Sequence, residues 1–448
     1  MPTALIVLAA GRGTRMQSDL PKVLHEIAGA PLLVHALDSA RELEAERKIV
    51  VTGSGAEAVE AAAMAHDETL TCVRQTEQLG TGHAVLQAKE ALAGHEGPAF
   101  VLYGDTPFIR PETLRAMAEA LEEASVVVLG FEAADPGQYG RLVTEGDRLL
   151  RIVEWKDASA QERAITLCNS GLIAADTTLL FELLGEVTNT NAAGEYYLTD
   201  LPGLAGQRGL VTRVVTCPEE ETLGINSRTD LAAATAAFQA RARREALEDG
   251  AQLDAPDTVF FAYDTVLGRD CTVEPNVVFG PGVTVETGAR IRAFSHLEGC
   301  HVARGAVVGP YARLRPGAEL AEDVRVGNFV EVKAAEIGEG AKINHLSYIG
   351  DAAIGAGTNV GAGTITCNYD GVMKHHTEIG KNAFIGSNTM LVAPVTVGDE
   401  AMTGSGSVIT RDVPEGDLAV ARARQENKPG LARRLMAKLR DIKAKKGK

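Results

Sequence analysis

The sequence has few aromatic residues, which make up only 4% of its 448 residues, whereas glycine occurs 47 times. Few large rings and many small side chains favour an architecture of regularly stacked strands. The chain is also 45% hydrophobic and 23% charged, a composition that excludes a disordered protein and allows sizeable buried cores. At this length we expect two domains, with three as the alternative.

The sequence also lacks net positive charge. It holds 60 acidic and 44 basic residues, for a formal net charge of −16. This balance argues against a general nucleic-acid-binding or membrane-surface-binding protein. It does not exclude anionic ligands, because backbone amides and a few lysines can bind phosphate within an acidic protein. We therefore predict small-molecule substrates, with neither nucleic acid nor membrane as a partner.

Paired cysteines and long apolar runs are absent as well. The six cysteines are scattered without a CxxC pair, which predicts reduced thiols rather than disulfides or a zinc site. The first apolar run, residues 4–10, has no basic flank and is too short for a signal peptide or a membrane span. No later run is long enough to cross a bilayer. We predict a soluble, cytoplasmic protein.

Residues 1–225 alternate apolar stretches with amphipathic ones. This alternation predicts βαβ units and a mainly parallel sheet, in a Rossmann-like α/β domain. The candidate strands are residues 5–8, 49–51, 99–102 and 126–129. The candidate helices are residues 32–43 and 111–121.

An Ala-rich segment studded with Arg and Glu, residues 229–248, predicts a helix, and Gly250 follows it as a stop signal. We interpret residues 226–250 as a linker helix between the first domain and a second domain over 251–423. Residues 424–448 form a basic C-terminal tail. Its last part, 431–448, holds eight Lys or Arg and one Asp, which favours a solvated tail, with contact to an acidic neighbour as the alternative.

Beyond the linker, an apolar residue recurs every six positions, with an occasional five-residue step. Such a hexapeptide repeat predicts a parallel β-helix, in which three hexads make one triangular coil. A polar insertion, residues 367–378, interrupts the repeat, and we expect it to be functional. The periodic residues are Val273, Phe279, Val285, Ile291, Leu297, Val302, Val308, Leu314, Leu320, Val326, Val332, Ile337, Ile343, Ile349, Ile354, Val360, Thr366, Ile379, Ile385, Leu391, Val397, Thr403 and Ile409.

The first predicted strand leads directly into the segment LAAGRGTRM, and Pro21 and Lys22 follow. Glycines let the backbone approach phosphate oxygens closely, and Arg15 and Lys22 supply positive potential. The third glycine of a generic dinucleotide-binding fingerprint is absent. The whole pattern is more specific, and it resembles the signature of sugar-1-phosphate nucleotidyltransferases.

Later segments strengthen this resemblance: QTEQLGTGHA, YGD, YGR, IVEWKD, CNSG and GINSR. Asp105 follows the third predicted strand, at the sheet edge where ligands of such folds bind. The resemblance implies that Asp105 and Asn226 bind metal, and two hard oxygen ligands suit Mg²⁺. It also implies a uracil-reading segment, and contacts from Gly140, Glu154 and Asn169 to the sugar. The implied nucleotide-binding and sugar-binding residues are Leu8, Ala9, Ala10, Gly11, Lys22, Gln75, Gly80, Thr81, Tyr103, Gly104, Asp105, Gly140, Glu154, Asn169 and Asn226.

The resemblance also implies the reaction class. A sugar-1-phosphate would attack the α-phosphorus of a nucleoside triphosphate and release pyrophosphate. Catalysis would come from positioning and charge neutralisation by Mg²⁺, Arg15 and Lys22, with no covalent intermediate.

Functional side chains recur on neighbouring coils of the second domain, in RLRPG, NFVEVK, NHLSY and NY. We expect His345 and Tyr348 to point outward. Glu331 lies 14 residues before His345, a spacing that can bring its carboxylate beside the imidazole. Acetyl transfer to an amine needs a base, and a neutral histidine oriented by a carboxylate suits this role near pH 7. We predict His345 as the base, with a solvent-facing corner histidine as the alternative.

From Leu8 to about Arg424, the chain resembles the family of bacterial bifunctional N-acetylglucosamine-1-phosphate uridyltransferases / glucosamine-1-phosphate acetyltransferases. This resemblance implies acetyl transfer from acetyl-CoA to glucosamine-1-phosphate, then uridylyl transfer from UTP to N-acetylglucosamine-1-phosphate. By the same resemblance, the product is expected to supply peptidoglycan and lipopolysaccharide synthesis. The resemblance also implies a left-handed β-helix. Because a triangular β-helix has flat faces and no deep cleft, we also predict a homotrimer, in which loop 367–378 reaches the neighbour's His345.

The same resemblance implies the binding residues of the acetyltransferase site. Ser405 stands where related sequences often have Ala, so a backbone contact is expected there. The amino-sugar phosphate would be bound by Arg315, Lys333, Tyr348 and Asn359. Acetyl-CoA would be bound by Ala362, Asn368, Tyr369, Ser387, Ser405 and Arg422.

Two other functions fit the same domain order. The first is a single-activity sugar nucleotidyltransferase whose β-helix is only a scaffold, and the acetyltransferase residues Glu331 and His345 argue against it. The second is a non-enzymatic assembly or regulatory subunit, and the nucleotidyltransferase residues Lys22, Asp105 and Asn226 argue against that.

Overall fold

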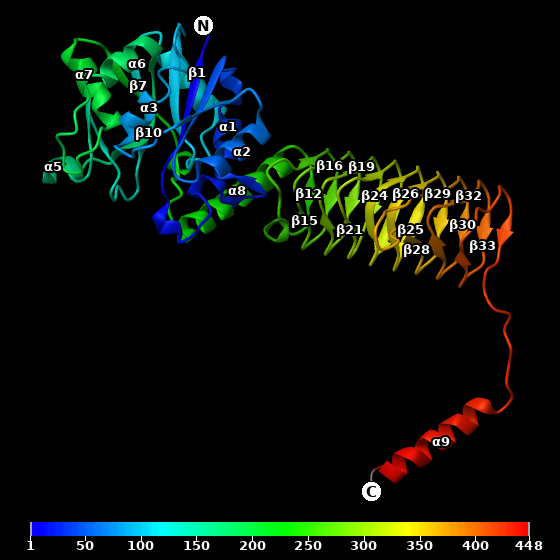
Figure 1. Ribbon diagram of the computed structural model, residues 1–448. Coiled ribbons are helices and arrows are strands. Elements are labelled where there is room, and N and C mark those ends of the chain that lie inside the picture. Colours follow the sequence, from blue (N-terminus) through cyan, green and yellow to red (C-terminus); the bar gives the residue numbers. More distant parts are fainter. Residues whose placement is uncertain (1, 447–448) are drawn as a thin grey trace. The chain divides into compact units, whose positions relative to one another are not determined.

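The computed structural model describes residues 2–446, which form two compact units (Figure 1). The first unit is the chain up to Arg244 together with Phe261–Tyr263, and the second is Glu245–Phe260 with the residues from Asp264 onward. The division falls within α8 (Arg228–Glu248), where the sequence predicted a helix over residues 229–248. None of the described helices is long and apolar enough to span a membrane.

The described strands of the first unit form one mixed sheet in the order β5-β4-β1-β6-β10-β7-β11-β9-β8. The strands β5, β4, β1 and β6 are parallel, as predicted, but β10 runs antiparallel to both β6 and β7. The prediction of a mainly parallel sheet is therefore wrong for this part, because the β8–β9 hairpin returns the chain before β10 and reverses its direction. The strands are β1 (Ala4–Ala9), β4 (Arg47–Thr52), β5 (Thr71–Arg74), β6 (Pro98–Tyr103), β7 (Val126–Glu132), β8 (Arg141–Glu145), β9 (Arg148–Val153), β10 (Leu167–Asp176) and β11 (Thr212–Thr216), with a separate pair β2 (Glu26–Ile27) and β3 (Ala30–Pro31).

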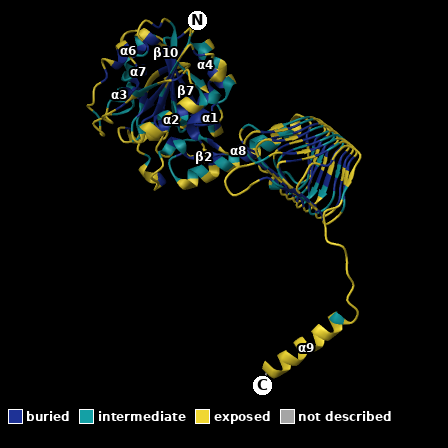
Figure 2. Ribbon diagram, turned by 45° about the vertical axis from the view of Figure 1, so that its right-hand side comes forward, coloured by how far each residue is buried: buried dark blue, intermediate teal, exposed yellow. Residues whose placement is uncertain are grey.

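Helices cover both faces of this sheet, and the strands alternate side chains between two cores (Figure 2). Ile6 and Leu8 of β1 belong to one core, and Leu5 and Val7 belong to the other. The segment predicted over residues 32–43 breaks at Ala40 into a helix and a 3₁₀ turn. The helical elements are η1 (Thr14–Met16), η2 (Lys22–Leu24), α1 (Leu32–Ser39), η3 (Arg41–Leu43), α2 (Ala56–His66), α3 (Thr81–Leu86), α4 (Pro111–Ala120), α5 (Ala160–Arg163), α6 (Thr177–Leu184), η4 (Leu198–Asp200), α7 (Leu201–Gln207) and η5 (Glu219–Thr222).

The second unit is a parallel β-helix, as the hexapeptide repeat predicted. Its short strands pair in parallel along three faces, so that Val273, Ile291, Val308 and Val326 lie one above another. Every periodic residue named above is at most 3% exposed, because each hexad sends one side chain into the narrow core.

Two faces of the β-helix belong to one sheet, because β24 and β26 turn a corner without interruption. The first face holds β12 (Gln252–Leu253), β14 (Thr272–Val273), β17 (Arg290–Ile291), β20 (Val307–Val308), β23 (Arg325–Asn328), β25 (Lys342–His345), β27 (Asn359–Val360), β30 (Phe384–Ile385), β33 (Met402–Thr403) and β35 (Leu418–Ala419). The other two hold β13 (Val266–Leu267), β15 (Val278–Phe279), β16 (Val283–Val285), β18 (His296–Leu297), β19 (Cys300–Val302), β21 (Arg313–Leu314), β22 (Ala318–Leu320), β24 (Glu331–Ile337), β26 (Tyr348–Ile354), β28 (Ile365–Cys367), β29 (Thr377–Ile379), β31 (Met390–Val392), β32 (Val395–Val397) and β34 (Val408–Ile409).

Three further segments of the second unit depart from the repeat. The predicted insertion leaves the β-helix after β28 and returns at β29, and a backbone bridge between Tyr369 and Lys374 closes it. Near the start of the unit, η6 (Pro256–Thr258) forms a single 3₁₀ turn. The basic tail forms α9 (Leu431–Lys446), a helix without buried residues.

Candidate active sites

The loop after β1 is shaped by the glycine that lies opposite Lys22. Gly13 has φ = 60°, and a Cβ built on it would lie 2.6 Å from the Cβ of Lys22. Any larger residue would therefore push the lysine stem away, in addition to the strain of this left-handed conformation. Gly11, which the sequence analysis selected, has open space around it. The loop geometry thus requires Gly13, which the sequence analysis did not select as a site residue.

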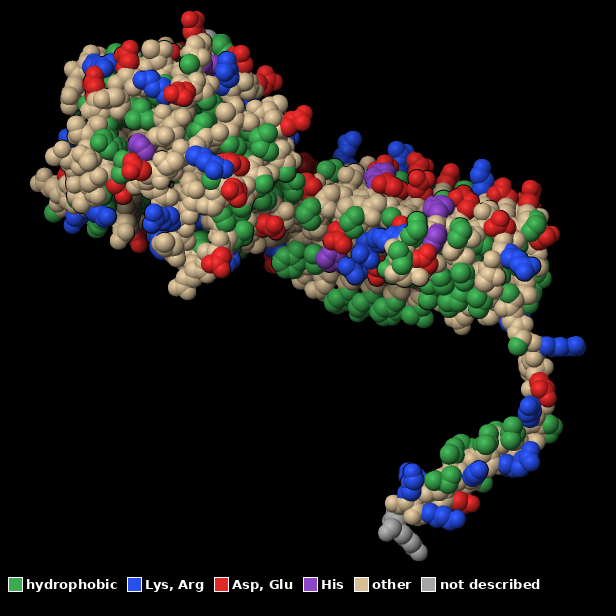
Figure 3. Space-filling model, in the orientation of Figure 1, with side chains coloured by type: hydrophobic (Ala, Val, Ile, Leu, Met, Phe, Trp, Pro, Cys, Tyr) green, Lys and Arg blue, Asp and Glu red, His purple; other side chains and the backbone are tan. Residues whose placement is uncertain are grey.

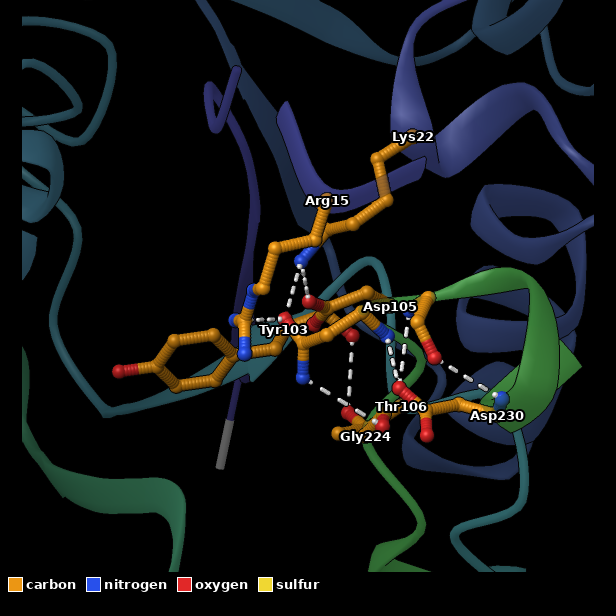
Figure 4. Close-up of polar contacts among 9 residues, drawn as sticks. Arg15, Lys22, Tyr103, Asp105, Thr106, Gly224 and Asp230 are labelled. Carbon is orange, nitrogen blue, oxygen red and sulfur yellow. Dashed lines mark hydrogen bonds and ion pairs between the residues drawn. The ribbon is translucent and has the colours of Figure 1, made fainter. Parts of the chain in front are cut away.

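Residues far apart in the sequence meet at the carboxyl end of β6 (Figure 4). The Lys22 ammonium forms an ion pair with Asp105 and lies 3.2 Å from Asn226 Oδ1. Arg15 Nη2 donates to the same Asn226 oxygen at 2.8 Å. The structure therefore brings together the two predicted metal ligands and the two predicted catalytic cations.

A helix cap holds Asn226 in this place. Asp230 Oδ2 accepts from the backbone N–H groups of Asn226 at 3.0 Å and Ser227 at 2.8 Å. The Asp230 N–H donates to Ser227 Oγ at 3.2 Å, which completes a capping arrangement at the start of α8. Ile225 N–H also donates to the backbone oxygen of Asp105 at 3.0 Å, so that the two segments are fixed side by side.

The predicted uracil-reading segment packs against the loop that follows β1. Gln75 is buried, and its Nε2 donates to Gly80 O at 3.1 Å and contacts His83 Nδ1 at 3.0 Å. Gln78 Nε2 donates to Ala10 O at 2.7 Å and thereby ties the two segments together. Sequence reasoning missed Gln78, although it lies within the same QTEQLG motif.

The three predicted sugar-contacting residues lie close together. A Cβ built on Gly140 would lie 3.5 Å from the Cβ of Asn169 and 3.6 Å from Glu154 Oε1. Asn169 N–H donates to Gly140 O at 2.9 Å. Burial raises the pKa of Glu154, while a hydrogen bond of 3.0 Å from Thr199 Oγ1 favours its charged form. Burial, with smaller contributions from the carboxylates of Glu154 and Asp105, also raises the pKa of Tyr103.

In the second unit, His345 is exposed, and its Nδ1 lies 2.9 Å from Asn328 Oδ1 on the preceding coil. Glu331, which the sequence analysis placed beside the imidazole, accepts instead from Arg315 Nη1 at 2.9 Å. The reason is the coil length: Glu331 pairs with Tyr348, and Asn328 pairs with His345, both 17 residues later. A spacing of 14 residues therefore does not stack two side chains. Asn328 was missed as a site residue, although the NFVEVK motif contains it.

Three cations gather near the predicted amino-sugar phosphate site. Arg315 and Lys333 occupy the same position on successive coils, and Lys374 approaches from the insertion. A hydrogen bond with Lys374 and then burial lower the pKa of Lys333, while Asp351 opposes this effect. Lys374 was not selected from the sequence, although a basic residue inside the insertion could have indicated it.

On the coil after Lys333, the corresponding position holds Gly350, and the missing side chain leaves room for polar groups. A Cβ there would collide with the Tyr348 hydroxyl and lie 2.9 Å from Asn368 Nδ2. Asn368 Nδ2 donates to the Tyr348 hydroxyl at 3.3 Å and to Asp351. Tyr369 is 61% exposed, and its hydroxyl donates to Gly371 O at 2.6 Å within its own loop.

The residues predicted to bind acetyl-CoA follow His345 coil by coil toward the C-terminus. In each case a backbone oxygen accepts a hydrogen bond from a backbone N–H on the next coil. His345 O accepts from Gly363 at 3.3 Å, Ala362 O from Asn388 at 2.7 Å, and Ser387 O from Gly406 at 2.8 Å. Ser405 O accepts from Arg422 Nη1 at 2.6 Å, so these two residues lie together. Asn359 lies on β27, between Lys342 and Phe384 of the neighbouring strands.

Comparisons with known proteins agree with both halves of this description. Residues 5–176 match the family model of the MobA-like NTP transferase domain. Residues 264–299 and 376–411 match that of the bacterial transferase hexapeptide (six repeats), which is consistent with a left-handed β-helix.

Full-length relatives are more decisive. The bifunctional protein GlmU of Jannaschia sp. (strain CCS1) is 62% identical over 447 residues, covering 100% of this chain and 98% of its own. That of Roseobacter denitrificans is 67% identical over 445 residues, covering 99% of both chains. That of Ruegeria sp. (strain TM1040) is 66% identical over 448 residues, covering 100% of both.

This chain belongs to the GlmU family. It is a bifunctional transferase with an N-terminal nucleotidyltransferase domain and a C-terminal hexapeptide acetyltransferase domain. The resemblance stated from the sequence is confirmed, and the single-activity and non-enzymatic alternatives are excluded.

Proposed function

We propose that the first unit transfers the uridylyl group of UTP to N-acetylglucosamine-1-phosphate at the site around Asp105. A phosphate oxygen of the sugar-1-phosphate attacks the α-phosphorus, the bond to the β-phosphate bridging oxygen breaks, and pyrophosphate leaves. Arg15 and Lys22 neutralise the phosphate charge in this reaction. The observation that carries the proposal is the convergence of both cations on Asp105 and Asn226.

The same residues fit Mg²⁺. Asp105 offers a carboxylate and Asn226 an amide oxygen, and both oxygens already face the Lys22 ammonium. Two oxygen ligands supplemented by substrate phosphates are the arrangement that Mg²⁺ favours, and within residues 2–446 no cluster of three or more His, Cys, Asp and Glu forms an all-protein metal site. When bound, Mg²⁺ would supply positive charge to the phosphate oxygens.

The second unit, in this proposal, transfers an acetyl group from acetyl-CoA to glucosamine-1-phosphate. With Nδ1–H donating to Asn328 Oδ1, the Nε2 lone pair of His345 can take the ammonium proton of the substrate. The freed amine attacks the thioester carbonyl, the C–S bond breaks, and the CoA thiolate leaves. Arg315 and Lys333 bind the sugar phosphate, since they are cations at the same position of successive coils.

Both reactions can be tested in one mixture of glucosamine-1-phosphate, acetyl-CoA, UTP and Mg²⁺. Free CoA and pyrophosphate are followed separately. The proposal requires both products, with pyrophosphate release dependent on prior acetylation. Release of only one product would contradict the substrate proposed for the unit that shows no activity.

These cytosolic substrates, and the free state of all six cysteines among the described residues, favour the cytoplasm as the site of action.

The second unit is proposed to assemble as a homotrimer. At one corner, exposed apolar residues of successive coils lie one above another and form a ladder. The ring of Tyr311 stacks on that of Phe294, with centroids 4.9 Å apart, and on that of Phe329, with centroids 5.3 Å apart. Figure 3 shows hydrophobic side chains gathered along one edge of this unit. An exposed apolar ladder of this kind suits contact with a copy of the chain. Its members are Phe294, Tyr311, Phe329 and Leu346, which directly follows His345.

A mixing experiment tests whether the acetyltransferase site is shared between subunits. His345→Ala and a variant lacking loop 368–376 are each inactive parents that must be shown to fold. After co-expression, some interfaces would pair an intact His345 with an intact loop from the neighbour. Acetyltransferase activity should therefore reappear. Hetero-oligomers that form and remain inactive would place the site within one chain.

A further inference from the structure

A fully buried arginine lies beside the sugar-contacting residues of the first unit. Arg141, the first residue of β8, is 1% exposed. Among residues 2–446, no carboxylate lies within 4.0 Å of its guanidinium. Burying a cation without a counterion is costly, so its place here calls for a role that other side chains cannot fill.

Backbone oxygens take the place of the missing carboxylate. Arg141 Nη1 donates to Pro136 O at 3.2 Å and to Tyr139 O, and Nη2 donates to Gly137 O at 3.0 Å. A longer contact of 3.5 Å reaches Arg163 O. The planar guanidinium thus fastens the turn that leads directly into Gly140.

Two other contacts reach the remaining sugar-contacting segments. The guanidinium lies over the ring of Trp155, 5.2 Å from its centroid, and Trp155 directly follows Glu154. Arg141 Nη1 also lies 3.8 Å from Cys168 Sγ, and Cys168 directly precedes Asn169. Arg141 and Cys168 are strand partners as well.

We propose that Arg141 is a positioning residue that fixes the geometry of the sugar site through Gly140, Glu154 and Asn169. Each of these three residues is adjacent in sequence to Arg141 or to a residue that its guanidinium contacts. Because one rigid, planar group holds all three segments, a change at Arg141 moves all three walls of the site together. The inference rests on the proposed sugar-phosphate substrate.

The test is the kinetics of uridylyl transfer by full-length Arg141→Met. We expect the KM for N-acetylglucosamine-1-phosphate to rise about 10-fold or more, while the KM for UTP changes less than about twofold. The preference for this substrate over glucosamine-1-phosphate should also fall. Acetyl transfer by the same chain reports that the protein remains folded outside the first unit.

Arg163→Met is the matched control. Arg163 is exposed and lies 4.5 Å from the centroid of the same Trp155 ring, but its side chain does not bond the 136–139 turn. Because Arg163 contacts Trp155 but not the turn, this variant should raise the KM for N-acetylglucosamine-1-phosphate much less than Arg141→Met does and leave the KM for UTP unchanged. A rise of both KM values together in Arg141→Met, or a loss of kcat alone, would overturn the proposal, because a purely structural role predicts either.

Two further variants keep the test decisive. Arg141→Lys retains the charge but cannot span the same backbone oxygens, so it should show the same selective rise in the sugar-phosphate KM. If neither Arg141 variant folds, Trp155→Ala, at a half-buried position, removes one attachment and should produce a smaller selective rise. Absence of that rise would count against the proposal. Wild-type enzyme that fails to use N-acetylglucosamine-1-phosphate would instead contradict the proposed function.

Discussion

The two units build their sites by different routes. In the first unit, Arg15 and Asn226 are 211 residues apart and meet only because the mixed sheet brings their loops together. In the second unit, Asn328 and His345 are 17 residues apart and meet because each coil stacks on the previous one. A site of the first kind depends on the entire domain, whereas a site of the second kind depends on a few neighbouring coils.

This difference determines what a substitution can disturb. In the first unit, a substitution at a helix cap, a hairpin or a buried arginine can alter the geometry of a site that lies far from the substituted residue. In the β-helix, each coil contacts its neighbours, so that effects should remain local. Five substitutions, with their controls, test this comparison.

The largest effect is expected from Asp105→Ala. It removes a predicted metal ligand and the partner of Lys22, and should abolish pyrophosphate release while leaving CoA release nearly intact. Both products are measured in the same assay. Asp147→Ala, in the exposed turn between β8 and β9, is the control and should have no effect. A folded Asp105 variant with near-normal uridylyl transfer would disprove the metal assignment.

His345→Ala should give the opposite pattern. Removal of a general base costs about 10²–10⁴ in rate, so acetyl transfer should fall by this factor while uridylyl transfer is spared. Asn328→Ala should cause a smaller loss, since it only orients the imidazole. His301→Ala, between Glu286 and Glu319 on another face, serves as the control. A loss confined to substrate KM would make His345 a binding residue.

A truncation in the β-helix core sharpens the comparison of stability. Ile343 is fully buried, and Ile343→Ala should cost about 2–5 kcal/mol in the unfolding of the second unit. The neighbouring Lys342 points outward, and Lys342→Ala should change stability by less than about 0.5 kcal/mol. Calorimetry of the full chain would show whether only one thermal transition moves. A shift of both transitions would indicate that the units do not unfold independently.

The smallest effect is expected at Glu154. Burial raises the pKa of this carboxyl, so its charged form destabilises the folded unit above the folded pKa, and the effect disappears below the unfolded pKa. Glu154→Gln should therefore raise the melting temperature slightly at neutral and alkaline pH, with a difference that shrinks as the pH falls toward about 4. Exposed Glu145→Gln is the control. A difference that grows on acidification would show that the sign is wrong.

The sequence was most informative where its pattern repeats. More than twenty hexad positions predicted the β-helix core, and every one of them is buried. Local signals also placed α8 and the first strands correctly, because each depends on nearby residues. The direction of β10 could not be read in this way, since antiparallel pairing with β6 follows from the β8–β9 hairpin and not from any signal in β10 itself.

The site residues also fall into those that the sequence predicted and those that only the structure showed. The sequence by itself determined the repeat, the two-domain order and the polar motifs, because periodicity and short motifs are local properties of a chain. Only the tertiary structure decided that Asn328, and not Glu331, contacts His345, because coil length sets which side chains stack. Only the tertiary structure likewise showed Arg141 beside the proposed sugar site, since burial without a counterion depends on which backbone oxygens the fold brings around it.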